Sequence, residues 1–140
     1  MIDLSTKFGR AVKRHLKNQY VIWLTTVDAT FTPQPRPVWF VWENDAFLIF
    51  SKPNAHKVKH IAKNPRVSLH FNTDETGDKH VIVFTGEGVI DSNCPPAHKV
   101  RGYLKKYKSG IIDLKMTAEG FSDEYSAAIR IQPTEVRGWE

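Results

Sequence analysis

The sequence predicts a mainly β, α+β protein: an antiparallel barrel with short helical insertions. Strand-like segments outnumber helix-like ones, and most neighbouring strands are separated by turns short enough for hairpins. Gly86 and Gly88 interrupt the longest strand, where a closing barrel needs a bulge or a sharp bend. Six or seven strands and three or four short helices are expected.

The first third of the chain predicts a helix followed by a hairpin. Apolar residues at helical spacing predict an amphipathic helix over residues 4–17, with Ser5 as its N-cap. Residues 20–27 are rich in β-branched and aromatic side chains and predict a buried strand, followed by a turn at 28–33. Residues 33–42 predict the returning strand. It should lie at a sheet edge, because Pro33, Pro35 and Pro37 lack amide donors.

The middle of the chain predicts further strands around one short helix. A strand over residues 46–51 follows a turn at 43–45. The helix is expected to begin near Pro53, with Ser51 or Asn54 as its cap, and to end before Asn64. Strands are predicted at 66–71 and 79–90, joined by a polar loop.

The last third predicts two helices and two closing strands. A helix opened by Pro95 and Pro96 is expected to run to about Tyr107, with a weaker helical stretch over 111–117. The closing strands are predicted at 125–131 and 134–136. No linker or low-complexity tract separates these elements, so residues 1–140 are expected to form a single domain.

Composition limits the class of protein. The chain is 41% hydrophobic and 25% charged, as in an ordinary globular protein. No membrane partner is expected, since no stretch approaches the ~20 consecutive apolar residues that a membrane span needs. Its single cysteine, Cys94, excludes an internal disulfide and favours a reduced, cytoplasmic location. The formal net charge of +5 suits an anionic ligand, but an ordinary basic surface explains it equally well.

The segment around residue 56 predicts an anion site. The first turn of the expected helix carries unpaired backbone amides and the positive end of the helix dipole. His56 and Lys57 lie in that turn, and Ser51 precedes it with a hydroxyl. Arg36 lies between two prolines of the edge strand, where a planar ligand would find free backbone groups. Solvent-exposed basic side chains are the alternative interpretation of both features.

Other clusters of reactive side chains predict less. His56 and His60 share a helix face, but no glutamate lies between them and the two lysines there oppose a cation. The other histidines, His15, His70 and His98, have no partners at ligand spacing. No metal site is therefore expected. Cys94 has no second cysteine at redox spacing, and the chain contains no glycine-rich phosphate loop. No residue is identified as a catalytic acid, base or nucleophile.

Four short segments occur in an order typical of one family: Arg36-Pro37-Val38-Trp39-Phe40-Val41, Phe50-Ser51-Lys52-Pro53, His56-Lys57 and Asn64-Pro65-Arg66-Val67-Ser68-Leu69. Together they resemble the pyridoxamine 5'-phosphate oxidase-like family of FMN-binding split barrels. More narrowly, they resemble its short branch, which includes coenzyme F-420-dependent oxidoreductases. The resemblance covers about residues 20–90. It implies a six-stranded antiparallel split β-barrel and a homodimer with flavin sites at the subunit interface.

The resemblance also implies cofactor contacts. The flavin ring and ribityl chain would lie along Arg36, Pro37, Val38, Trp39, Phe40 and Val41. The phosphate would be bordered by Phe50 and Ser51 and contacted by His56 and Lys57. His80 would approach from the partner subunit, where the oxidases carry glutamine. The oxidases also carry arginine at the position of His56, and residues 136–140 do not reproduce their carboxyl-terminal Trp and Arg pattern, so pyridoxamine 5'-phosphate oxidase activity itself is not expected.

The implied function is hydride transfer through a non-covalently bound flavin, FMN, acting on an unidentified small-molecule substrate. A deazaflavin (coenzyme F-420) dependent reductase is one alternative, because the basic helix face at Lys99–Lys108 could hold a polyglutamyl tail. A non-enzymatic flavin- or haem-binding carrier or sensor is another. The charge and the aromatic residues also raise a nucleic-acid-binding barrel, although nucleic acid is not the expected partner.

Overall fold

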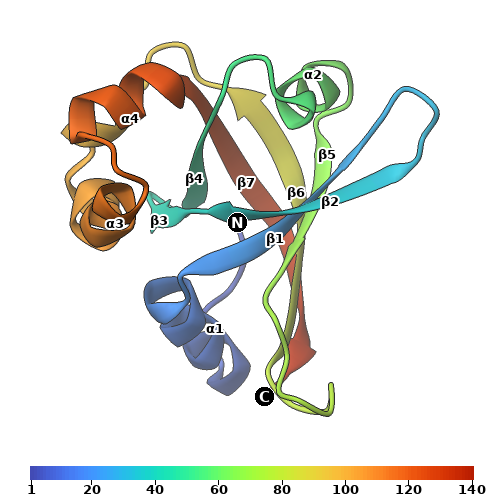
Figure 1. Cartoon of the computed structure of the whole chain (residues 1–140). Helices are drawn as coiled ribbons and strands as arrows, with labels where there is room; N and C mark the ends of the chain where they lie inside the picture. The colour runs from blue at the N-terminus through green and yellow to red at the C-terminus, as the bar shows by residue number, and fades with distance from the viewer.

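The computed structural model describes residues 1–140 as seven strands and four α-helices (Figure 1). In chain order they are α1 (Lys7–Asn18), β1 (Val21–Val27), β2 (Pro33–Trp39), β3 (Val41–Glu43), β4 (Ala46–Ser51), α2 (His56–Lys63), β5 (Arg66–His70), β6 (Val81–Ile90), a 3-10 turn (Ala97–Lys99), α3 (Arg101–Asp113), α4 (Ala118–Glu124) and β7 (Ala127–Trp139). The strands form one antiparallel sheet that curls into a half-barrel. The predicted split-barrel class is confirmed, with seven strands in place of six.

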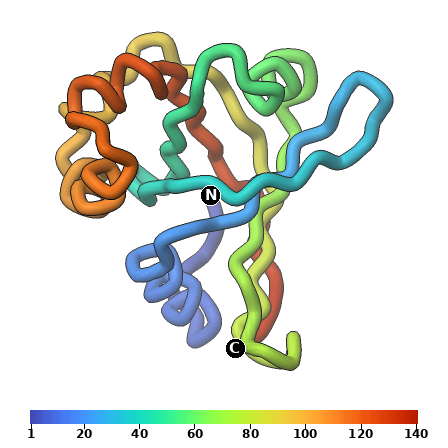
Figure 2. The backbone as a smooth tube through the Cα atoms, in the orientation of Figure 1, coloured from blue at the N-terminus to red at the C-terminus, as the bar shows by residue number.

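The two edges of the sheet are joined by the chain itself. The strand order is β2-β1-β5-β6-β7-β4-β3, and the edge strands β2 and β3 are separated only by Phe40 (Figure 2). The additional strand arises because the proline-rich segment predicted over 33–42 divides at this residue. The Tyr107 hydroxyl lies 2.8 Å from both the amide and the carbonyl of Phe40, so α3 supplies the partners that the sheet does not.

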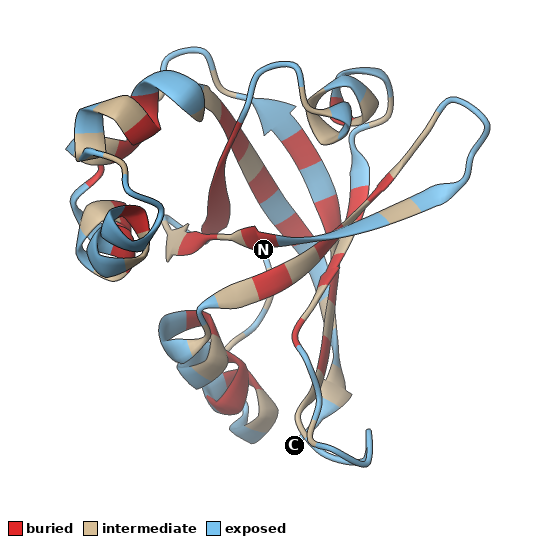
Figure 3. Cartoon of the chain, in the orientation of Figure 1, coloured by how far each residue is buried: buried red, intermediate tan, exposed pale blue.

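Two apolar clusters stabilise this arrangement. Buried and partly exposed residues alternate along β1 and through most of β6 (Figure 3). The buried apolar residues of both strands belong to the main core cluster. Phe40, Phe47 and Phe84 are fully buried there, each contributing roughly 1.5–3 kcal/mol. A second cluster, which includes Tyr103 and Phe121, packs α3 and α4 against β4. None of the helices is long and apolar enough to cross a membrane.

The predicted cap of α1 is wrong by one residue. The Thr6 side chain accepts a hydrogen bond from the Gly9 amide at 2.9 Å, which makes Thr6 the N-cap. The hydroxyl of Ser5 instead donates to the Asp3 carboxylate at 2.6 Å. The helix therefore begins at Lys7, three residues later than the apolar pattern predicted.

The predicted start of α2 is also wrong. Residues 52–55 form a turn in which the Ala55 amide donates to the Lys52 carbonyl at 3.1 Å. Ala55 becomes the N-cap and the helix begins at His56, so neither Ser51 nor Asn54 caps it. His56 and Lys57 nevertheless lie in the first turn, as predicted.

The closing elements differ from the prediction in length. Helix α3 continues to Asp113, and α4 occupies residues that were not expected to be helical. Strand β7 is continuous, although two separate strands were predicted at 125–131 and 134–136. Gly86 pairs with Pro133 and Thr85 with Glu135, so Thr134 is an extra residue of β7. The irregularity expected near Gly86 is present, but the bulged strand is β7 and not β6.

Candidate functional site

The first turn of α2 leaves backbone amides available to a ligand. The first hydrogen bonds of the helix run from the amides of Val58 and Lys59 to the Ala55 carbonyl, at 3.1 and 3.5 Å. The amides of His56 and Lys57 precede these bonds, and the Ala55 cap provides no side-chain acceptor. No acidic residue lies in this turn. The free amides and the positive end of the helix dipole therefore favour an anion here.

A cavity of about 440 Å³ adjoins this turn, and we refer to it as the charged cavity. It lies between the start of α2 and the β1–β2 hairpin, and it is lined by Thr26, Asp28, Gln34, Arg36, Ala55, His56, Lys57 and His60. Lys57 is half-buried, and its pKa is lowered by burial and by the neighbouring Arg36. Neither cation forms an ion pair with a carboxylate. Two unpaired cations facing one cavity favour an anionic ligand.

Asp28 is the only carboxylate that lines the charged cavity, and its oxygens already have partners. They accept hydrogen bonds from the amides of Thr30 and Thr32 at 2.9 and 3.0 Å and from the Gln34 side chain at 3.0 Å. These hydrogen bonds, led by that from Thr32, hold the pKa of Asp28 well below its ordinary value. Asp28 therefore stabilises the hairpin turn and does not neutralise Arg36 or Lys57.

A second cavity, of about 180 Å³, shares Lys57 with the first. We call it the aromatic cavity, because seven of its nine lining residues are hydrophobic and most of these are aromatic: Val38, Trp39, Phe50, Tyr103, Leu114, Phe121 and Tyr125. Pro37 and Lys57 complete the lining. The Trp39 ring stacks on Tyr107 and on Phe121, with centroids 4.6 and 5.8 Å apart. A charged cavity next to an aromatic one suits a ligand with an anionic end and a flat apolar body.

From Pro33 to Pro37 the free edge of β2 offers acceptors only. The β1–β2 ladder is continuous from Pro33 to Trp39, and its hydrogen bonds need amides that proline lacks. The residues between the prolines must therefore face β1. It follows that the carbonyls of Pro33, Pro35 and Pro37 face outward. A ligand lying along this edge meets a row of carbonyl oxygens without neighbouring amide donors.

The structure divides the residues predicted to contact a cofactor into groups. Those lining the charged cavity are Arg36, His56 and Lys57. Those lining the aromatic cavity are Pro37, Val38, Trp39 and Phe50, with Lys57 shared. Three others line neither cavity and have buried side chains: Phe40, Val41 and Ser51. The Ser51 hydroxyl donates to the Lys52 carbonyl at 3.0 Å, and Phe40 is engaged by Tyr107.

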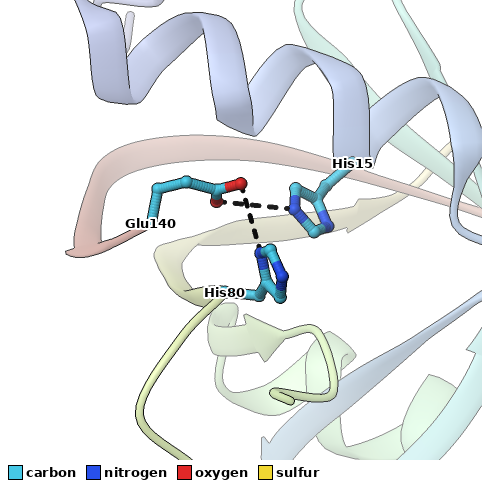
Figure 4. A group of neighbouring side chains, drawn as sticks. All are labelled: His15, His80 and Glu140. Carbon is cyan, nitrogen blue, oxygen red and sulfur yellow. Dashed lines mark ion pairs between the residues drawn. The ribbon is translucent and has the colours of Figure 1, made fainter.

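His80 lies away from both cavities within one chain. It precedes β6, and its Nδ1 lies 3.2 Å from the Glu140 carboxylate, which is also 3.7 Å from His15 Nε2 (Figure 4). The contact of His80 with a cofactor bound by the partner subunit stays a prediction. No spacing in the sequence could indicate this cluster, because each residue comes from a different third of the chain.

The basic side of α3 faces another part of the molecule. Lys105 and Lys106 line a cavity that shares no residue with the charged or the aromatic cavity. The Lys106 ammonium donates to the Phe40 carbonyl at 2.9 Å and lies 3.7 Å from the centre of the Phe40 ring. Burial lowers its pKa to about 8. Lys106 and Tyr107 thus fix the link between β2 and β3, a role that no sequence motif indicated.

The model of the pyridoxamine 5'-phosphate oxidase family matches residues 8–140, nearly the whole chain. The chain belongs to this family. The family that the motifs between Arg36 and Leu69 implied is therefore confirmed. The charged and the aromatic cavity are lined in part by residues of these motifs. A search of curated proteins finds no match.

Several solved structures share this fold at low sequence identity. An FAD-binding protein from Mesorhizobium loti has a TM-score of 0.64 and 16% identity, covering 91% of this chain and 88% of that one. An F420 reductase has a TM-score of 0.62 and 21% identity, with coverages of 89% and 94%. The heme storage protein HutZ from Vibrio cholerae has a TM-score of 0.65 and 17% identity, with coverages of 97% and 94%. At these identities, the likeness shows the fold alone.

Proposed function

We propose that the chain is an oxidoreductase that binds FMN non-covalently and transfers hydride between the flavin and a small-molecule substrate. The observation that carries this proposal is the position of Arg36 and Lys57. These two cations have no carboxylate partner and line the charged cavity at the first turn of α2, where backbone amides are free. The charged cavity suits a phosphate, and the adjoining aromatic cavity suits part of a planar ring. Membership of the family supports the same ligand.

The residues of the charged cavity would hold the phosphate. Lys57 supplies a half-buried charge and Arg36 a guanidinium, while the free amides of His56 and Lys57 supply directional donors. His56 stands where the oxidases carry arginine, so Lys57 and Arg36 must provide most of the positive charge. The carbonyls at the outer edge of β2 can accept a hydrogen bond from a ring N–H.

The aromatic cavity would position the reacting part of the ligand and exclude water from it. The flavin, when bound, supplies the hydride chemistry. No carboxylate or imidazole lines this cavity, and burial raises the pKa of the Tyr103 hydroxyl far above neutral pH. Lys57 is the one amine in the lining, and it is assigned to the phosphate, so water would exchange protons with the substrate. The protein contributes position and electrostatics.

The assembly we propose is a cytoplasmic homodimer in which His80 reaches the cofactor of the partner subunit. The single thiol, Cys94, supports a reducing compartment, and the family resemblance supports the dimer. Nucleic acid and membranes form no part of the proposal, since both cavities are small and suit a small molecule.

Deazaflavin is the second candidate cofactor, because an F420 reductase shares the fold. A polyglutamyl tail would need a basic groove leading away from the ring. The basic side of α3 does not provide one, since its cavity shares no residue with either ligand cavity. FMN, which ends at its phosphate, fits the charged cavity without such a groove. A carrier of flavin or haem on the same fold is the non-enzymatic alternative.

The test is the identity of the cofactor that copurifies with the chain, followed by turnover. We expect the mass of FMN and an absorption band at about 450 nm that a reductant bleaches, with colour returning on addition of an electron acceptor. A released deazaflavin or haem would overturn the FMN assignment. Bleaching without turnover on any acceptor tested would indicate a carrier and would refute the enzymatic proposal.

A further inference from the structure

Three potential metal ligands meet at the end of β6 that lies away from α2. His15 comes from α1, His80 precedes β6, and Glu140 follows β7 (Figure 4). One ligand atom from each lies within 4.8 Å of the other two. Neither ligand cavity of the same chain includes any of these residues, and His80 is the one of the three that is also proposed to reach the cofactor of a partner subunit.

The backbone holds His80 in place for this contact. His80 has a φ of 61°, in the left-handed region that non-glycine residues seldom occupy. Its amide donates to the Glu140 carbonyl at 3.4 Å, which joins the start of β6 to the end of β7. The neighbouring Trp139 indole donates to the Asp78 carbonyl at 2.6 Å and fixes the same end of β7. The imidazole and the carboxylate are therefore brought together by the main chain.

The facing nitrogen of His80 has no hydrogen-bond partner. Nδ1 is buried and lies 3.2 Å from Glu140 Oε1, but in a direction that makes no hydrogen bond. A buried polar atom without a partner is unfavourable, because it has lost its hydrogen bonds to water. A cation placed between the imidazole and the carboxylate would use the lone pair of this nitrogen.

His15 is also held in position to bind a cation. Its ring packs against the rings of Phe71 and His80, with ring centroids 5.7 and 5.4 Å apart. Its Nδ1 lies 3.3 Å from the side-chain amide of Gln19. After rotation of the Gln19 amide, its oxygen can accept a hydrogen bond from the Nδ1–H of His15, which leaves the lone pair of Nε2 facing Glu140.

We propose that His15, His80 and Glu140 bind one divalent transition-metal ion of the zinc class, with water as a fourth ligand. Two neutral imidazoles and a carboxylate are a set that zinc accepts. Bonds of about 2.0–2.1 Å place tetrahedral ligand atoms roughly 3.3 Å apart. His80 Nδ1 lies 3.2 Å from Glu140 Oε1 and His15 Nε2 lies 3.7 Å from Glu140 Oε2, both near this value. Since the three ligand atoms already lie within 4.8 Å of one another, side-chain rotations would be enough to bring them around one ion. Arg14 lies near His15 and opposes the ion, but the carboxylate offsets its charge.

The experiment titrates the chelator-treated, cofactor-free full chain with Co²⁺ and with Zn²⁺. We expect one ion per chain, a Co²⁺ visible spectrum typical of nitrogen and oxygen ligands, and a rise in melting temperature with Zn²⁺. Glu140→Gln and His15→Gln should each weaken binding at least tenfold. Because Glu140 is exposed, Glu140→Gln should disturb the fold less than His15→Gln. Circular dichroism checks that both variants are folded. His98→Gln, which alters a histidine bonded to Ser122 elsewhere, should leave binding unchanged.

The proposal is overturned if no stoichiometric binding occurs. It is also overturned if Glu140→Gln and His15→Gln bind the ions as tightly as the parent chain, or if His98→Gln weakens binding as much as they do. Because no flavin is present in this titration, its outcome is independent of the proposed oxidoreductase activity.

Discussion

Replacing Lys57 by alanine is expected to weaken FMN binding without unfolding the protein. The Lys57 ammonium is half-buried, faces the charged cavity and has no carboxylate partner. A hydrogen bond between charged groups in such a place contributes about 1.5–3 kcal/mol. The dissociation constant of FMN should therefore rise about ten- to 150-fold. The fold should tolerate the change, since burial and Arg36 already disfavour the charged ammonium.

The assay is a fluorescence titration of cofactor-free protein with FMN, with the melting temperature measured in parallel. Lys59→Ala is the matched control, because Lys59 is exposed on the same helix and lies outside the charged cavity. It should change the dissociation constant less than about twofold, as expected for an exposed charge. The phosphate assignment is refuted if Lys57→Ala binds FMN like the parent. Equal losses in both variants would instead indicate a general effect of charge.

The remaining predictions concern the frame of the site and its titration. Tyr107→Phe removes the acceptor of the Phe40 amide and should lower the free energy of unfolding by about 1–3 kcal/mol, measured by urea denaturation. Gly86→Ala should lower the free energy of unfolding by about 1–3 kcal/mol, because the new methyl would meet the β7 backbone at 2.5 Å. Gly102 in α3 has open space around it, so Gly102→Ala should raise the free energy of unfolding by about 0.5–1 kcal/mol. FMN affinity should fall as pH rises through the pKa of Lys57, which lies below that of an ordinary lysine. Arginine stays charged, so Lys57→Arg should remove this fall, as measured by FMN titrations between pH 7 and 10. The contribution of Lys57 to folding stability has the opposite sign: it increases over the same pH range, because the unfolded chain binds the proton more tightly.

The sequence predicted an element correctly where neighbouring residues alone determine its conformation. The apolar stripe of α1 and the Asn44–Asp45 turn between β3 and β4 are examples, since short-range sterics and burial decide both. The end of α3 was missed because it depends on packing. Gly110 has a low helix propensity, but its small size lets Tyr20 and Trp39 approach the helix, which therefore continues past Tyr107.

The same distinction applies to the candidate site. The basic first turn of α2 could be recognised from Lys57 and its neighbours, although a turn at residues 52–55 moved the helix start to His56. The approach of Arg36 to Lys57 could not be derived from spacing, because the β1–β2 hairpin brings it there. The same holds for Tyr107, which binds Phe40 from a helix 67 positions further along the chain.

The outward prolines of β2 also determine how copies of this chain can meet. Growth of a sheet from one molecule to the next requires an edge that alternates amides and carbonyls, and this edge has carbonyls alone from Pro33 to Pro37. A strand of a second copy would find acceptors but lose the reciprocal donors, so edge-to-edge polymerisation through β2 is disfavoured. The proposed homodimer would then use a surface other than this edge. The same three residues that leave the edge open to a ligand thereby protect the protein against aggregation.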